Sequence, residues 1–137
     1  MTNYKGFFAH IEDETVQNTS FRNVQYTGAY SQLVYMSLKA GEEIGKEKHG
    51  ADQFFRVEAG NGKSYVDNQE YDIADGDCVI VPAGAMHNIV NTGNGDLKLY
   101  TIYSIPNHID GENFATKAEA EANDKPFDGR TTEGQTK

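Results

Sequence analysis

Short segments in which apolar and polar residues alternate recur along this chain, and tight turns rich in Gly, Asn and Asp separate them. Turns such as "AGNGK", "ADGD" and "TGNGD" fall at intervals of roughly eight to twelve residues, the spacing of an antiparallel barrel or sandwich. The 14 glycines agree with so many tight turns. The segments expected to form strands are 20–28, 31–42, 43–49, 52–60, 60–66, 67–73, 77–82, 87–93 and 97–106.

The length of 137 residues suits one domain, and the strand pattern places its barrel core at about residues 20–105. An N-terminal segment, 1–19, and a C-terminal extension, 106–137, flank this core. Within the extension, the stretch "TKAEAEAND" predicts one short helix, because Thr116 can cap it and Glu119 follows at the spacing of a capping box.

The formal net charge of −9 argues against nucleic acid and anionic membranes as partners. No window approaches the roughly 20 apolar residues of a transmembrane helix, and the first residues do not resemble a secretory signal. Cys78 is the single cysteine, so an intramolecular disulfide is excluded, which fits a reducing compartment. We therefore expect a cytoplasmic, soluble protein with Cys78 as a small core residue.

The stretch "GDCVIVPAGAMHNIVN" has the pattern G-x5-P-x-G-x2-H-x3-N, formed by Gly76, Pro82, Gly84, His87 and Asn91. Pro82 and Gly84 would end an apolar strand and reverse the chain, because Pro lacks a ladder donor and Gly accepts unusual dihedral angles. His87 would then open the next strand and share a face with Asn91. It is either a metal ligand or a buried histidine that hydrogen-bonds to the backbone.

In this pattern the sequence resembles the cupin superfamily, whose second motif has the same spacing and the same five marked residues. The resemblance covers roughly residues 20 to 105 and is strongest toward small single-domain bacterial cupins. It implies an all-β fold, the antiparallel double-stranded β-helix or RmlC-like jelly-roll barrel, with a metal or ligand pocket inside. It also implies a homodimer, because an open barrel edge invites pairing between two copies.

The first cupin motif, G-x5-H-x-H-x3-E-x6-G, matches Gly41, Glu47, His49, Gln53 and Gly60 in this chain. Both glycines and one of the three ligand residues are kept. Glu47 replaces the first histidine and Gln53 replaces the glutamate. By itself this altered motif is a weak signal, and its weight comes from the intact second motif.

The resemblance gives four candidate metal ligands, namely Glu47, His49, Gln53 and His87. The first three occupy odd positions and so point to one face of extended chain, where His87 could join them from the other hairpin. The set carries one negative charge, as the family's three histidines and one glutamate do. Oxygen donors now equal nitrogen donors, which favours Mn²⁺ or Fe²⁺, with Zn²⁺, Ni²⁺ and Co²⁺ as alternatives.

These assignments have alternatives. Glu47 lies in a charged run and could be solvated, or it could be a catalytic base beside the metal. Gln53 could hydrogen-bond a metal-bound water instead of the ion, and His108 is expected at the surface of the extension. The expected apolar and aromatic pocket wall consists of Tyr35, Phe55, Tyr65, Ile89 and either Tyr100 or Ile102.

Two classes of function stay open. The first is a metalloenzyme that acts on a small organic molecule, either as an isomerase or lyase with the metal as Lewis acid, or as a dioxygenase with a redox-active metal. The second is a non-catalytic barrel that binds a small ligand. We expect no attached output domain, which favours the enzyme, and the sequence does not identify a substrate.

Overall fold

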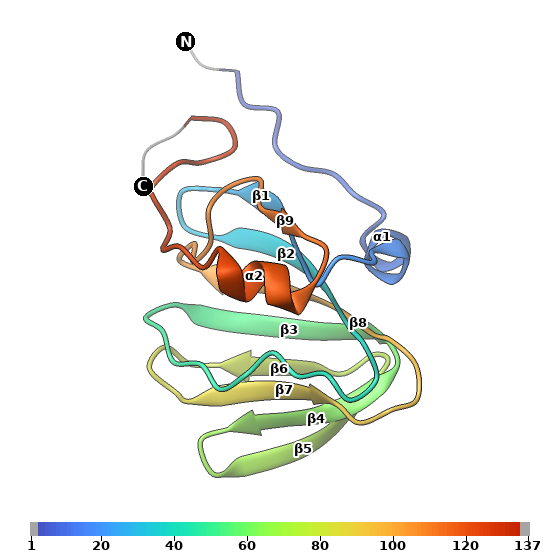
Figure 1. Ribbon diagram of the computed structural model, residues 1–137. Coiled ribbons are helices and arrows are strands. Elements are labelled where there is room, and N and C mark those ends of the chain that lie inside the picture. Colours follow the sequence, from blue (N-terminus) through green and yellow to red (C-terminus); the bar gives the residue numbers. More distant parts are fainter. Residues whose placement is uncertain (1–2, 135–137) are drawn as a thin grey trace.

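The structure, a computed structural model, describes residues 3–134 and consists mainly of antiparallel strands (Figure 1). Neither helix in that range has the length and apolar character needed to cross a membrane. In chain order the elements are α1 (Ile11–Gln17), β1 (Arg22–Thr27), β2 (Gln32–Leu38), β3 (Asp52–Ala59), β4 (Asn61–Val66), β5 (Gln69–Ala74), β6 (Cys78–Val81), β7 (His87–Asn91), β8 (Leu97–Ser104), β9 (Asn113–Phe114) and α2 (Lys117–Ala122).

Two sheets form the barrel. The larger has the strand order β6-β3-β8-β2-β1-β9, and the smaller has the order β5-β4-β7. All pairings are antiparallel, as the hairpin spacing of the sequence predicts. The expected strand 43–49 is instead an irregular segment that lies along β7 through isolated bridges. The all-β jelly-roll prediction is confirmed.

The core lies between the two sheets and follows the period-two alternation of their strands. On β8, alternate residues from Leu97 to Tyr103 point inward, and their neighbours point to the outer face. The strands β2, β3, β6 and β7 contribute the same kind of inward row. The core residues that are at most 1% exposed are Val34, Leu38, Phe55, Val57, Val81, Leu97 and Leu99.

The helix α1 covers part of the outer face of the larger sheet, and the sequence pattern did not predict it. Its N-cap is His10, which makes no side-chain capping bond, so the usual Ser, Thr, Asp or Asn signal is missing. Instead, the Glu14 carboxylate accepts a hydrogen bond from the His10 backbone N–H at 3.2 Å. The same side chain reaches the Tyr35 hydroxyl at 3.2 Å, which attaches the helix to β2.

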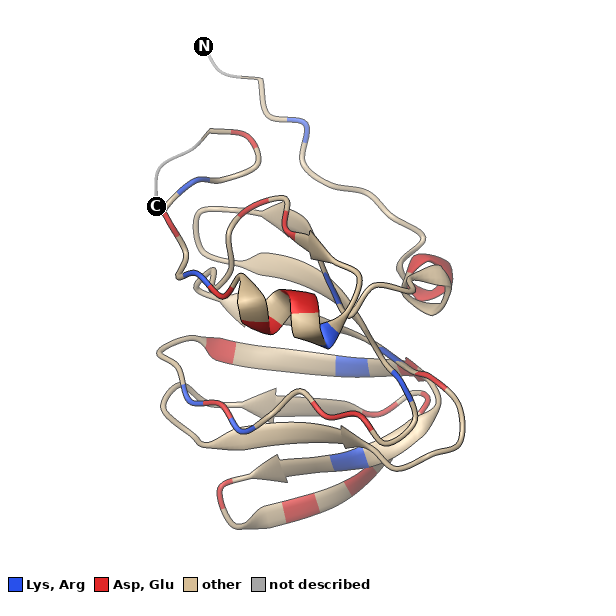
Figure 2. Cartoon of the chain, in the orientation of Figure 1, with Lys and Arg blue, Asp and Glu red and all other residues tan. Residues whose placement is uncertain are grey.

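The C-terminal extension returns to the barrel. The strand β9 pairs with β1, and α2 follows with Thr116 as its N-cap, whose hydroxyl accepts a hydrogen bond from the Glu119 N–H at 3.1 Å. The predicted short helix is therefore confirmed. Figure 2 shows acidic residues on both helices and on β5, so the negative charge is spread over surface elements.

Candidate metal centre

Glu47 and His87 face each other because the chain from 41 to 49 pairs with β7. The two residues exchange both backbone hydrogen bonds, each 2.9 Å long. Between the bridges Glu43–Val90 and Glu47–His87, the first chain has one residue more than β7, which is a β-bulge. Gly45 lies in this bulge with a φ of 105°, a value that L side chains rarely adopt. The bulge therefore turns Glu47 to the same side as His87.

The hydrogen bonding of His87 leaves one ring nitrogen available. Its Nδ1 donates to the Ala85 carbonyl at 3.1 Å, which leaves the lone pair on Nε2. Nε2 is buried, has no hydrogen-bond partner among the described residues, and lies 3.8 Å from Glu47 Oε2. Burial lowers the pKa of His87, so the ring stays neutral. This is the arrangement of a metal-ligating histidine with a backbone carbonyl behind it.

His49 lies beside His87 and contacts Gln53. The His49 and His87 ring centroids are 4.8 Å apart, in an edge-to-face arrangement. His49 Nε2 lies 2.9 Å from Gln53 Oε1, and the Gln53 amide is oriented by its Nε2, which donates to Thr101 Oγ1 at 2.9 Å. This separation allows a hydrogen bond between the two atoms. It also allows the lone pairs of His49 Nε2 and Gln53 Oε1 to face one cation. Ligation by Gln53 therefore stays a prediction.

The structure brings together three of the four predicted ligands as a possible cation cluster. One ligand atom each of Glu47, His49 and His87 lies within 4.8 Å of the others. Burial raises the pKa of the Glu47 carboxyl, while the nearby His49 acts in the opposite direction. One carboxylate and two imidazoles fit a divalent transition metal ion, and two buried ring nitrogens, His49 Nδ1 and His87 Nε2, have no hydrogen-bond partner among the described residues.

The predicted pocket wall is only partly correct. Phe55 and Ile89 point into the barrel and are 1% and 2% exposed. The other predicted wall residues lie on the outer faces, because they alternate with inward neighbours such as Thr101 and Ser64. These outward residues are Tyr35, Tyr65, Tyr100 and Ile102.

Two further expectations are wrong. Cys78 is exposed, because Val79 and Val81 take the inward positions of β6. His108 is buried at 6% exposure, and its Nε2 lies 3.0 Å from the Tyr103 hydroxyl. Burial lowers the pKa of His108 to about 3, so this histidine is neutral in the folded protein. The Tyr103 ring in turn packs on His49, with centroids 5.6 Å apart.

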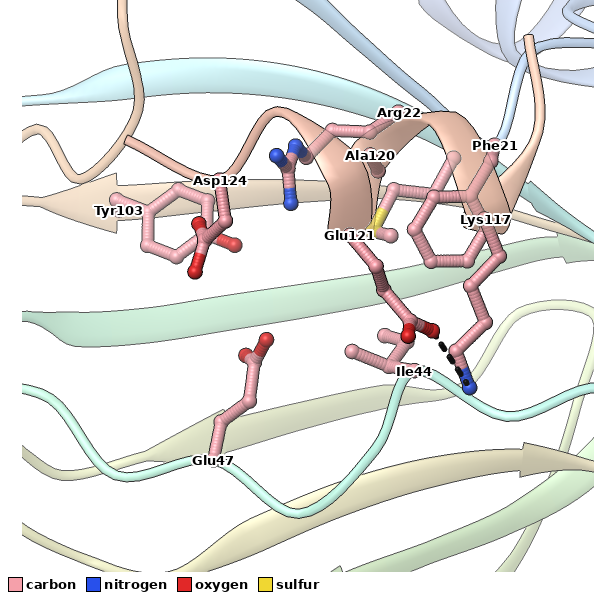
Figure 3. A pocket seen from close by; sticks show the side chains of 10 residues that line it. Phe21, Arg22, Ile44, Glu47, Tyr103, Lys117, Ala120, Glu121 and Asp124 are labelled. Atoms are coloured by element: carbon pink, nitrogen blue, oxygen red, sulfur yellow. Dashed lines mark ion pairs between the residues drawn. The ribbon is translucent and has the colours of Figure 1, made fainter. Parts of the chain in front are cut away.

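A cavity of about 170 Å³ adjoins the cluster on the side of Glu47 (Figure 3). The barrel supplies one wall and α2 the other, so the extension covers the barrel mouth. The lining residues are Phe21, Arg22, Met36, Ile44, Glu47, Tyr103, Lys117, Ala120, Glu121 and Asp124. Sequence reasoning missed Arg22, although its place in the first strand at the parity of the inward Val24 is a usable signal.

Comparisons with known proteins agree with this architecture. The Cupin domain family matches residues 34–103. The Bacillus subtilis protein YrkC is 44% identical over 126 residues, in a match that covers 86% of this chain and 67% of YrkC. Protein L612 of Acanthamoeba polyphaga mimivirus is 39% identical over 111 residues, covering 77% of this chain and 69% of L612.

The crystal structure of BH2720 from Bacillus halodurans superposes with a TM-score of 0.84 at 42% identity. The match covers 86% of this chain and 95% of that one. Sequence match, strand order and the two glycine-bearing motifs lead to the same assignment: this chain belongs to the cupin family.

Proposed function

We propose that this cupin binds a divalent metal ion, with manganese or iron favoured, and acts on a small organic molecule in the adjacent cavity. The observation that carries the proposal is His87 Nε2, which is buried, has no hydrogen-bond partner in the described part of the chain, and lies 3.8 Å from the Glu47 carboxylate. Leaving a buried polar atom unpaired costs about 1–3 kcal/mol, and a bound cation would remove that cost.

Different residues of the chain would have different roles at this site. His49, His87 and Glu47 would hold the ion, while Ala85 fixes the His87 ring and Gln53 contacts His49. A bound divalent ion would supply Lewis-acid polarisation of substrate oxygens, or a redox centre in the case of iron or manganese. The lining between Glu47 and α2 would bind and orient the substrate and exclude water.

The test is elemental analysis of protein purified without a histidine tag, compared with Glu47→Ala and His87→Ala. His10→Ala is the matched control, because His10 is exposed and lies outside the cluster. We expect about one ion per chain in the wild type and the control, and a loss in His87→Ala. Wild-type protein that takes up none of Mn²⁺, Fe²⁺, Ni²⁺ or Zn²⁺ would overturn the proposal.

Two further readouts separate the remaining alternatives. If Glu47→Ala keeps its metal, Glu47 is either a base beside the ion or a bystander rather than a ligand. Measurement of oxygen consumption with candidate substrates distinguishes a dioxygenase from an isomerase or lyase. A protein that binds metal and small molecules but turns none of them over would be the non-catalytic binding barrel.

A further inference from the structure

Arg22 is a buried cation in the wall of the cavity beside the candidate metal centre. It opens β1, pairs in register with Met36 on β2, and is 7% exposed. In Figure 3 its guanidinium and the Glu47 carboxylate turn toward the same space. Burial of an arginine costs free energy unless its N–H groups form hydrogen bonds, so the partners of these groups indicate the role of the residue.

Within the described part of the chain, the guanidinium of Arg22 is only partly satisfied. Its Nη2 reaches Glu112 Oε1 at the long distance of 3.5 Å, and the group stacks over Phe114 at 5.4 Å. Its Nε is buried and has no hydrogen-bond partner among residues 3–134. A guanidinium carries five N–H donors in a planar fork, the geometry that binds a carboxylate through two parallel bonds.

A purely structural role explains only part of this arrangement. Through Glu112 and Phe114, Arg22 attaches the extension to β1, but that role does not use Nε or require a place in the cavity wall. The other cation of the lining, Lys117, is less buried, because its side chain is 25% exposed and water can reach its donors, while its Nζ lies 3.9 Å from Glu121 Oε1. Among the described residues of the lining, Arg22 is therefore the buried cation with a donor that has no partner.

The balance of charge around the cavity would also permit an anion once the metal is bound. Glu47, Glu121 and Asp124 oppose Arg22 and Lys117, an excess of one negative charge that a divalent ion would reverse. Counting Glu112, behind Arg22, brings the formal sum to zero, so the bound ion removes the negative excess that would repel an anion. The volume of about 170 Å³ is close to that of an engineered cavity of 150 Å³ in another protein that binds benzene, so a molecule of about six non-hydrogen atoms would fit.

We propose that the substrate of this cupin is a small organic carboxylate and that Arg22 is the residue that binds its carboxylate group. This inference rests on the proposed function, because it takes the cavity beside Glu47 as the substrate site. The carboxylate would lie against Arg22, with the rest of the molecule directed toward Glu47, His49 and His87.

The test is calorimetric titration of full-length, Mn²⁺-loaded protein with lactate and pyruvate, each of which has six non-hydrogen atoms. Lactamide, of equal size but uncharged, is the control ligand. The protein variants are Arg22→Gln and Arg22→Lys, with Glu112→Gln as the control that loosens the anchor and leaves the guanidinium in place. Metal content is measured on every sample before titration.

We expect wild type and Glu112→Gln to bind at least one of the two carboxylates and to bind lactamide at least about tenfold more weakly. Arg22→Gln should keep its Mn²⁺ and lose about tenfold or more in carboxylate affinity. Arg22→Lys retains the positive charge but not the planar fork of donors, so its carboxylate affinity should lie between those of wild type and Arg22→Gln. This variant also tests the inference if Arg22→Gln does not fold.

Three results would overturn the inference: Mn²⁺-loaded wild type binds neither carboxylate, lactamide binds as tightly as lactate, or both Arg22 variants bind like wild type. Failure of wild type to take up Mn²⁺ is a different outcome, because it contradicts the proposed function. In that case the same titrations on metal-free protein still show whether Arg22 binds a carboxylate.

Discussion

Single residues decide whether the re-arranged first motif still forms a site. Glu47 stands where the family pattern has a histidine, yet the bulge at Gly45 turns it toward His87. Gln53 stands where the pattern has a glutamate, and its amide lies between His49 and Thr101. Compared with the family pattern, the carboxylate therefore occupies a different position of the motif. The cluster contains one negative charge and two imidazoles.

Replacing Gln53 with leucine should weaken Mn²⁺ binding by about 10–100-fold, because His49 loses the group that contacts its Nε2. Competition with a metal-sensitive dye measures the affinity. Gln32→Leu is the matched control: this glutamine is also buried, but its amide bonds to Thr27 and to the backbone at His108. The control should lose stability and keep its metal affinity, and equal affinities in both variants would contradict this role of Gln53.

Residues whose role follows from a local pattern could be predicted from the sequence. His87 and Asn91 could be recognised because the turn before them and the strand that contains them are formed by consecutive residues. The inward parity of Arg22 on its strand was a local signal, but its role was not found, because its partner Glu112 is 90 residues away in the sequence. Pairings of this length depend on the fold of the whole chain.

At the scale of elements, the C-terminal extension is part of the barrel rather than a loose tail. The Gln32 side chain, at the start of β2, accepts hydrogen bonds from the backbone N–H groups of Asn107 and His108 and donates to the His108 carbonyl. This attachment buries His108 against Tyr103 and positions α2 over the cavity.

Buried His108 should make the metal-free protein sensitive to acid. Its folded-state pKa of about 3 lies below its unfolded value near 6.5, so between these values the unfolded chain binds the extra proton. The stability that neutral His108 contributes is therefore fully present above pH 6.5, and it decreases as the pH falls below that value. Between pH 6.5 and 4.5, urea unfolding should show a loss about 2 kcal/mol larger in wild type than in His108→Gln. Parallel curves for the two proteins would contradict this.

The close pairing of β4 with β7 should tolerate no side chain at Gly62. A Cβ atom there would overlap the Val90 carbonyl, so Gly62→Ala must separate the strand that supports His87 from its neighbour. We expect a loss of about 2 kcal/mol or more in urea unfolding. Gly95→Ala is the control, because its Cβ would meet nothing within 4 Å and it should be neutral or slightly stabilising. Similar unfolding curves for both variants would argue against this packing.

At the scale of the whole molecule, turn spacing predicted an antiparallel all-β barrel, and the two motifs predicted its family. What could not be predicted depends on which face each strand turns inward. Alternation alone does not say whether Tyr35 or Val34 faces the core, because both are buried, one under α1 and one inside the barrel. The homodimer stays a prediction, and sedimentation analysis would test it.

A cation bound only by the folded barrel should stabilise the whole molecule. At a Mn²⁺ concentration of 100 times Kd, the gain is about 2.7 kcal/mol. For a chain of this size that corresponds to a rise in Tm of roughly 8 °C. The His87→Ala variant should show little of this shift, and His10→Ala should show all of it. A shift of equal size in all three proteins would place the stabilising cation elsewhere.

The central claim is that Glu47, His49 and His87 bind one divalent ion in the barrel mouth. Anomalous diffraction from crystals soaked in Mn²⁺ tests it most directly. The account predicts one strong peak within bonding distance of a Glu47 oxygen, a His49 ring nitrogen and His87 Nε2, and the same map shows whether Gln53 Oε1 is a fourth ligand. A map without a peak between these three side chains, from protein soaked at saturating Mn²⁺, would contradict the account.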